Sequence, residues 1–255
     1  MSEKRETILR LLQDETGRIL DVKIFQEMTP EKPETPEEPE TPEKPLTVIE
    51  LKPDTEETAL YNLTEGSVVD WGDGSKSVVT AEEANLRQTV LHAYATTATA
   101  NRVVTIDGVI DRRGEQAATA FDSNALIAVR TLGEVRGEAS LLFAGCGNLT
   151  AIPAGLFDHC TAMTSFNYCF YGCSNLTAIP AGLFDHCTAV TDLSGCFKKC
   201  NNLTGETPYT MVDGKKVKLW ERSPENGFAK VTSHESCFKD CPYLSDYAEI
   251  PSDWK

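Results

Sequence analysis

The sequence predicts a mainly β fold with short helices, in which a small β-sandwich is followed by a solenoid of stacked repeats. Two observations carry this prediction. Residues 143–169 and 170–196 form a tandem repeat that is identical at 20 of 27 positions, and a repeat of this period is typical of a stacked array. Residues 46–111 contain short runs of β-branched and aromatic residues that are separated by turn residues, which is the pattern of a small sandwich.

An N-terminal segment, residues 1–28, precedes these parts. Residues 3–12 place Ile8, Leu11 and Leu12 at spacings suited to one face of a helix, whereas residues 17–25 alternate imperfectly, as a strand does. A segment this short cannot bury a core alone. We therefore expect it to dock on a virion or to associate with another copy of the chain.

Residues 29–45 form a linker rich in proline and glutamate. Polyproline II has three residues per turn and rises about 3.1 Å per residue, so this segment is expected to span on the order of 50 Å. A proline-rich ligand for an aromatic groove is the alternative interpretation. Proline occupies every third position: Pro30, Pro33, Pro36, Pro39, Pro42 and Pro45.

The segment 46–111 carries a specific turn motif. WGDGS at residues 71–75 specifies a tight turn, and His92-Ala-Tyr94 follows on a later strand. These motifs resemble the PKD-type immunoglobulin-like domain over residues 46–110, although the glycine-x-tyrosine that usually follows is replaced here by ATTATANRVV. The resemblance implies an extracellular stalk module without catalytic activity.

Two further interpretations of this module concern its polar residues. Hard cations take oxygen ligands, but the four aspartates lack the close alternate spacing of a calcium loop. His92 lies on an expected strand with no nucleophile beside it, so a structural role is favoured over catalysis. The aspartates are Asp70, Asp73, Asp107 and Asp111.

The segment 112–255 is expected to be the solenoid, with a degenerate first coil that ends near residue 142. Within a coil, NLTAIP and TDLSGCF are predicted to be extended and AGLFDHC to be a short helical piece. These units resemble BspA-like leucine-rich repeats over residues 143–255. A WGDG domain combined with such an array is similar to surface proteins of gut Bacteroides and to tail or fibre proteins of their phages, and this resemblance implies surface adhesion.

The repeated polar residues are expected to be structural. Nine cysteines fall into three columns and are predicted to form a reduced, buried ladder; the asparagines before each Leu-Thr are predicted to form a buried ladder bonded to turn backbone rather than glycosylation sites. A zinc site from His159, Cys160, His186 and Cys187 is disfavoured because adjacent side chains diverge. The columns are Cys146, Cys173, Cys200 and Cys241; Cys160 and Cys187; Cys169, Cys196 and Cys237; and Asn148, Asn175 and Asn202.

Candidate ligand-binding residues lie at positions where the two repeat units differ and in an insert that follows them. Five of the seven differences between the two units cluster near the second extended segment, where alternate residues are expected to face outward. An insert at about 205–231 contains Asp-Gly between alternating residues, a strong hairpin signal; its aromatic residues could instead fold back onto the array. The candidates are Ser165, Asn167, Asp192 and Ser194 on the array, and Tyr209, Lys215, Lys216, Trp220 and Arg222 in the insert.

Composition limits the functions that remain. The formal net charge of −15 argues against nucleic acid as a partner, and the sequence holds no run of about 18 apolar residues that would insert into a membrane. Residues 1–25 lack the apolar core of a secretory signal. No catalytic constellation or phosphate-binding glycine motif can be assembled, so we expect no enzyme activity, no cofactor and no metal.

These observations favour a non-enzymatic adhesion or receptor-binding protein. We expect a phage tail or head fibre component, on a virion or an extracellular surface, whose repeats bind a bacterial surface glycan or protein. A bacterial surface adhesin and an intracellular protein-interaction scaffold are the alternatives.

Overall fold

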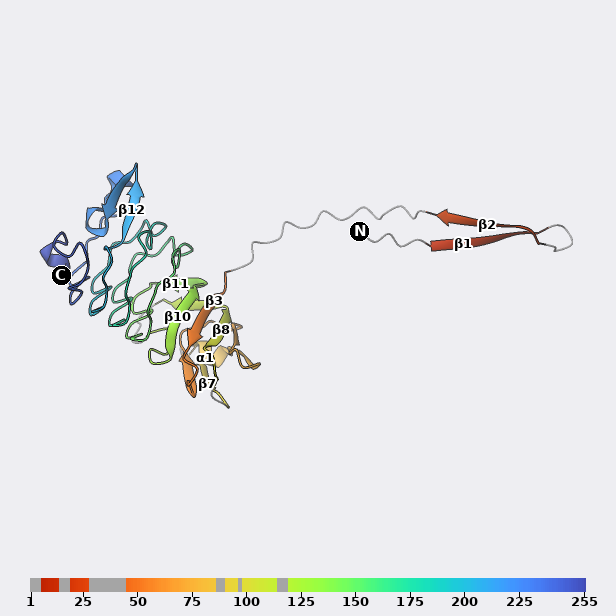
Figure 1. The fold of residues 1–255 in the computed structure, drawn as a ribbon, viewed down its shortest axis with the longest axis horizontal. Helices are drawn as coiled ribbons and strands as arrows, with labels where there is room; N and C mark the ends of the chain where they lie inside the picture. The colour runs from red at the N-terminus through yellow and green to blue at the C-terminus, as the bar shows by residue number, and fades with distance from the viewer. Residues whose placement is uncertain (1–5, 14–18, 28–44, 86–89, 96–97, 114–118) are drawn as a thin grey trace. The chain divides into compact units, whose positions relative to one another are not determined.

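The computed structural model describes residues 6–13, 19–27, 45–85, 90–95, 98–113 and 119–255. The chain divides into two compact units, Met1–Glu43 and Lys44–Lys255. Among the described residues the fold is mainly β, as predicted, with one short helix, α1 (Ala81–Asn85), and three single 3₁₀ turns (Figure 1). The predicted polyproline linker, apart from Pro45, lies outside the described residues.

The first unit contains an antiparallel pair of strands, β1 (Glu6–Gln13) and β2 (Ile19–Glu27), with Leu9 opposite Ile24 and Leu11 opposite Val22. The strand predicted over residues 17–25 is confirmed for its described part, residues 19–25. The helix predicted over residues 3–12 is wrong for its described part. A short apolar run satisfies helical and strand periods alike, and β2 supplies the hydrogen-bonding partner that a strand needs.

The second unit begins with a five-stranded sheet in the order β10-β3-β8-β5-β6. Residues alternate between buried and half-buried along β3. Successive side chains of this strand therefore point alternately into the core and away from it, as in a sheet that packs on one side. A separate antiparallel pair, β4–β7, lies beside it. The bounds are β3 (Thr47–Leu51), β4 (Glu57–Leu60), β5 (Val68–Asp70), β6 (Lys76–Val78), β7 (Val90–Ala93), β8 (Arg102–Asp107) and β10 (Leu126–Thr131).

The WGDG turn joins β5 to β6 as the sequence predicts. Gly72 and Gly74 have φ values of 75° and 93°, and a Cβ on Gly72 would lie 2.3 Å from the carbonyl oxygen of Val103. The turn therefore needs glycine at position 72 for both backbone conformation and space. Trp71 beside it is fully buried and donates from Nε1 to Ser77 Oγ at 2.8 Å.

The boundary expected between residues 111 and 112 falls inside a strand. β9 (Val109–Arg112) pairs in parallel with β11 (Glu134–Gly137), and β10 pairs with β3. Residues expected to form only a degenerate first coil thus also complete the sheet. One hydrophobic core runs through the whole second unit, because the terminal turn of the array needs a cover for its apolar face.

Beyond the sheet, successive turns of chain stack side by side toward the C-terminus (Figure 1). Backbone N–H groups of one turn donate to carbonyls of the next at equivalent positions, as from Phe143 to Cys169, at 2.8 Å. A column of buried phenylalanine rings runs through the stack, with neighbouring centroids 5.3 to 5.6 Å apart and nearly parallel planes. Its members are Phe121, Phe143, Phe170, Phe197 and Phe238.

The pieces within each turn are less regular than predicted. The predicted extended segments are reduced to isolated parallel bridges that join Ser165 to Asp192 and Asp192 to Ser233. The AGLFDHC piece is a run of single turns, such as Asp158 N–H to Gly155 O at 3.0 Å, and not a helix. Backbone hydrogen bonds within each repeat close short turns, and those between repeats join neighbouring turns of the stack.

Candidate ligand-binding surface

The cysteine columns lie inside the stack. All nine cysteines are buried with free thiols, and thiols of one column donate to the carbonyl of the preceding turn, as from Cys173 Sγ to Phe143 O at 3.2 Å. Burial raises the pKa of the Cys146 and Cys241 thiols to about 12. These cysteines therefore fill space and bond backbone, and they are neither exposed nor ionised at neutral pH.

The buried asparagine ladder is a wrong prediction. Asn175 and Asn202 are exposed, and Asn148 is half-buried with its Nδ2 bonded to Asn124 O at 2.9 Å. The leucine that follows each asparagine fills the core, which turns the asparagine outward. Threonine side chains take the expected role, since Thr Oγ1 bonds the carbonyl of the equivalent threonine one turn earlier; these are Thr177 to Thr150 and Thr204 to Thr177, both at 3.3 Å.

The four array candidates face outward and are half-buried, while Phe166 and Leu193 between them are buried. Three of the candidates bond across turns. Ser165 Oγ donates to Asp192 Oδ2 at 3.1 Å, and Ser194 Oγ donates to Glu235 Oε2 at 3.1 Å. The polar side chains of these three candidates thus help to hold neighbouring turns together. Among the four candidates, all of them in the described part of the chain, only Asn167 has no side-chain hydrogen bond to a neighbouring turn.

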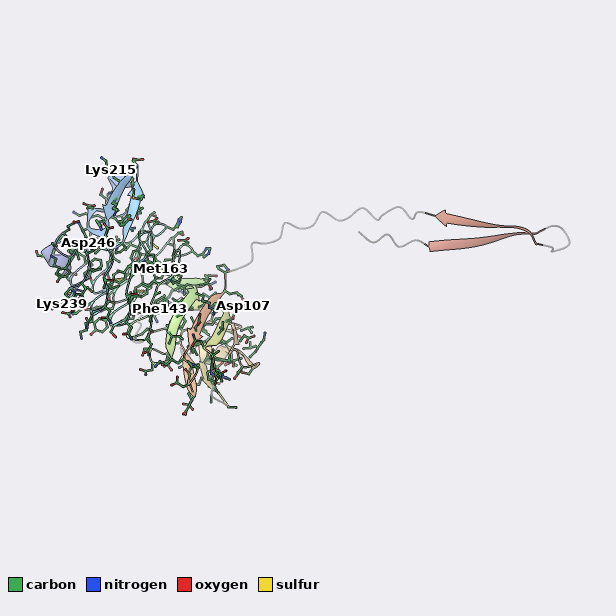
Figure 2. The ribbon with its side chains drawn as sticks, viewed as in Figure 1. Asp107, Phe143, Met163, Lys215, Lys239 and Asp246 are labelled. Atoms are coloured by element: carbon green, nitrogen blue, oxygen red, sulfur yellow. The ribbon has the colours of Figure 1, made fainter. Side chains whose placement is uncertain are left out.

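The insert forms the predicted hairpin, β12 (Tyr209–Val212) and β13 (Lys215–Lys218). Asp213 and Gly214 have φ values of 48° and 76°, the two left-handed residues of a tight type I′ turn. The hairpin projects from the stack in Figure 1, and Lys215 lies at its outer end in Figure 2.

Two of the insert candidates anchor the hairpin. Arg222 is 3% exposed and donates to the carbonyls of Phe184 and Cys187 at 2.8 and 3.1 Å; burial lowers the pKa of its guanidinium to about 10. Trp220 is half-buried, with its ring 6.0 Å from that of Trp254. Arg222 was therefore wrongly assigned to a ligand surface, because carbonyls left open where the insert leaves the stack need a donor.

A buried ion pair fixes the second strand of the hairpin. Lys218 Nζ lies 2.6 Å from Asp246 Oδ2 and 2.8 Å from Glu206 Oε1, while Thr207 N–H donates to Asp246 at 3.0 Å. Burial raises the pKa of Asp246, but the hydrogen bonds from Lys218 and Thr207 outweigh it and lower the pKa overall. The base of the hairpin is thus rigidly held.

The tip of the hairpin carries Lys215 and Lys216, whereas Tyr209 pairs with Lys218 at its base. Lys215 and Lys216 are exposed, and Met211 on the opposite strand is 55% exposed. Lys216 Nζ lies 4.3 Å from the Tyr209 ring centroid and 2.6 Å from Glu206. The tip is a small basic and apolar surface on an acidic protein.

Sequence reasoning overlooked a group of tyrosines on the stack. Tyr168 and Tyr171 lie side by side with ring centroids 5.4 Å apart, and Tyr243 is 66% exposed beside a concavity of about 400 Å³. The signal was available in the repeat, since two of its seven differences involve tyrosine: Tyr168 of the first unit stands opposite Gly195, and Tyr171 of the second unit stands opposite Ala144.

Two of the aspartates considered for calcium, Asp70 and Asp73, have other partners. Asp73 Oδ2 lies 2.8 Å from His92 Nε2. Hydrogen bonds from Ser75 lower the pKa of Asp73, and burial, which raises this pKa, has a smaller effect. Asp70 accepts from Gly72 N–H. His92 stacks on Trp71 at 4.6 Å, which fits the structural role expected for it.

The described part of the chain contains no group of three or more His, Cys, Asp or Glu side chains placed to hold a metal ion. Of the four residues considered for a zinc site, His159 and His186 are exposed whereas Cys160 and Cys187 are buried. The histidine and thiol side chains therefore diverge, as expected for adjacent residues.

Comparisons of the chain with protein-family models, with curated proteins and with solved structures find no match. None of the helices in the described residues has the length and apolar character needed to cross a bilayer.

Proposed function

We propose that this chain is a non-enzymatic display protein that binds a bacterial surface ligand through its stacked turns. In this proposal, the first part of the second unit is an immunoglobulin-like sandwich that serves as a stalk, and the remainder is a leucine-rich-repeat-type solenoid. The similarity of WGDGS and of the repeat motifs to PKD-type and BspA-like modules supports this assignment.

The proposal depends above all on a division between repeated and unrepeated side chains. The repeated phenylalanines, leucines and cysteines are buried in the stack, where each turn packs on its neighbours. The unrepeated polar residues and tyrosines lie on the outside or in the projecting hairpin, whereas the unrepeated apolar pair Phe166 and Leu193 stays in the interior. A stack that keeps its interior apolar and varies its outer residues is suited to recognition.

We further propose that the protein is a phage tail or head fibre component. Its support is the similarity to proteins of gut Bacteroides and their phages, together with the two-stranded sheet of the first unit, which presents strand edges to a partner. A virion or another copy of the chain is the proposed partner of that sheet.

The test is saturable binding of the labelled full chain to Bacteroides cells, measured by flow cytometry against unrelated bacteria. We expect binding that saturates on at least one Bacteroides strain, with no release of soluble sugar from the cells. Absence of binding to every strain would favour the intracellular scaffold, and progressive release of sugar would favour an enzyme.

The hairpin tip is tested with a charge reversal at Lys215. We expect Lys215→Glu to weaken cell binding if the tip contacts the ligand, whereas Lys230→Glu, an exposed lysine outside the hairpin, is the matched control. Equal binding of both variants and the wild type would remove the tip from the ligand surface.

A further inference from the structure

The Tyr168 ring lies against the next turn of the stack, where the chain has glycine. A Cβ on Gly195 would be 2.5 Å from Tyr168 Cε1. Gly195 has a φ of 60°, but its equivalents Leu141, Tyr168 and Ser236 adopt φ values of 59°, 52° and 60° without being glycine. Backbone conformation therefore does not require glycine at position 195, and the space taken by the tyrosine ring does.

Tyr171 is held beside this ring by the same neighbouring turn. Lys199 Nζ donates to Tyr171 Oη at 2.8 Å and lies 5.2 Å from the ring centroid. The two tyrosine rings meet edge to face, with an interplanar angle of 70°. Both rings are half-buried, so each keeps part of its surface open to solvent in a fixed orientation.

Lys199, which bonds Tyr171, also borders the concavity of about 400 Å³ beside Tyr243. Its other lining residues are Asn201, Asp240, Pro242 and Tyr243. Tyr243 is 66% exposed, so most of its ring is open to a ligand. We call Tyr168, Tyr171, Lys199 and the residues lining the concavity the tyrosine tract.

The chemistry of the tract matches that of a sugar chain. Sugar C–H groups carry partial positive charge and pack on the electron-rich face of an aromatic ring, while hydroxyls bond sideways to amide, carboxylate and ammonium groups. The tract offers rings together with the Asn201 amide, the Asp240 carboxylate and the Lys199 ammonium. The two opposite charges cancel, which favours a neutral ligand over an ionic one.

We propose that the tyrosine tract binds a neutral oligosaccharide of the bacterial surface. This rests on the proposed function, since it names the ligand class of the same display surface. A protein partner fits less well, because stable protein interfaces cover about 800 Å² on each side and centre on larger apolar anchors. An anionic ligand would be drawn to the hairpin lysines and away from the tract.

The experiment measures binding of the full chain to Bacteroides cells that have been treated with periodate, which cleaves vicinal diols of sugars, or with protease. Wild type is compared with Tyr243→Ala and Tyr171→Ala, and with Tyr61→Ala as a tyrosine control in the β-sandwich. Circular dichroism and thermal unfolding establish that each variant is folded. Competition with neutral oligosaccharides released from the same cells gives a second readout.

The expected result is binding that survives protease, is lost after periodate and is competed by the released neutral sugars. Tyr243→Ala should weaken it about tenfold, the loss of one ring contact, and Tyr61→Ala should not. Binding that survives periodate and is lost after protease would overturn the saccharide assignment while the display function stands. Unchanged binding by Tyr243→Ala and Tyr171→Ala would overturn the location, and no binding to untreated cells would remove the proposed function itself.

Discussion

Glycine at position 195 offers the sharpest test of how the stack accommodates its unrepeated residues. The perturbation is Gly195→Ala, made alone and with Tyr168→Ala. The left-handed φ of 60° costs an alanine about 1 kcal/mol relative to glycine. The new Cβ, 2.5 Å from Tyr168 Cε1, must also displace the ring, at a cost of about 1–3 kcal/mol for overpacking.

The cost of Gly195→Ala should therefore depend on the ring. We expect about 2–4 kcal/mol in the wild-type background and about 1 kcal/mol when Tyr168 is already alanine. The measurement is the free energy of unfolding of all four proteins by urea denaturation, analysed as a double-mutant cycle. Costs that add within about 0.5 kcal/mol would refute the coupling, and with it the reason given for glycine at this position.

Three further predictions concern the parts that hold the surface in place. Asp246→Asn should lower the free energy of unfolding by about 3 kcal/mol, since it breaks a buried ion pair while Lys218 keeps its pairing with Glu206. Because the pKa of Asp246 is lowered in the fold, the stabilisation by this pair should be present above about pH 4 and lost as pH falls further. Urea titrations of both proteins across pH 2–7 measure this, and a pH-independent difference between them would contradict it. Arg222→Met should cost about 2–4 kcal/mol by leaving two buried carbonyls without their donor, whereas Lys215→Met at the exposed tip should change stability by less than about 0.5 kcal/mol; comparable melting temperatures for the two variants would show that the guanidinium is not an anchor. All nine thiols should resist a thiol reagent at pH 8 in the native protein and react after unfolding, and rapid native-state labelling would contradict their burial.

The sequence predicts the parts of the fold that rest on local signals. Asp213-Gly214 between alternating residues specifies a hairpin whatever surrounds it, and the columns of Phe143 and Leu149 must stay apolar in any stack. The mainly β character follows from the same signals.

Other features depend on contacts between distant residues, which one sequence does not reveal. β1 is a strand because β2 pairs with it, although its apolar spacing also suits a helix. Residues 126–131 join the sheet because β3 has an open edge. The sequence around a charged residue such as Arg222 does not show whether its side chain is buried or exposed. Its role follows from the backbone carbonyls of Phe184 and Cys187, to which it donates hydrogen bonds.

The surface was predicted in part. The rule that alternate residues of the second extended segment face outward located Ser165, Asn167, Asp192 and Ser194, all of which lie on the outer side. The tyrosines at positions 168 and 171 stand at unrepeated positions too, but their relation to Gly195 and Lys199 requires the 27-residue offset to be converted into contact between turns.

The central claim is that repeated residues build the stack and unrepeated ones bind the ligand. The most direct measurement compares equilibrium binding to Bacteroides cells of two double variants, Tyr171→Ala/Tyr243→Ala in the tyrosine tract and Asn175→Ala/Asn202→Ala at exposed repeated positions. We predict that the tyrosine variant loses about 100-fold in affinity, two ring contacts at about tenfold each, while the asparagine variant binds as the wild type does. Equal binding by both variants, or loss only in the asparagine variant, would contradict the claim.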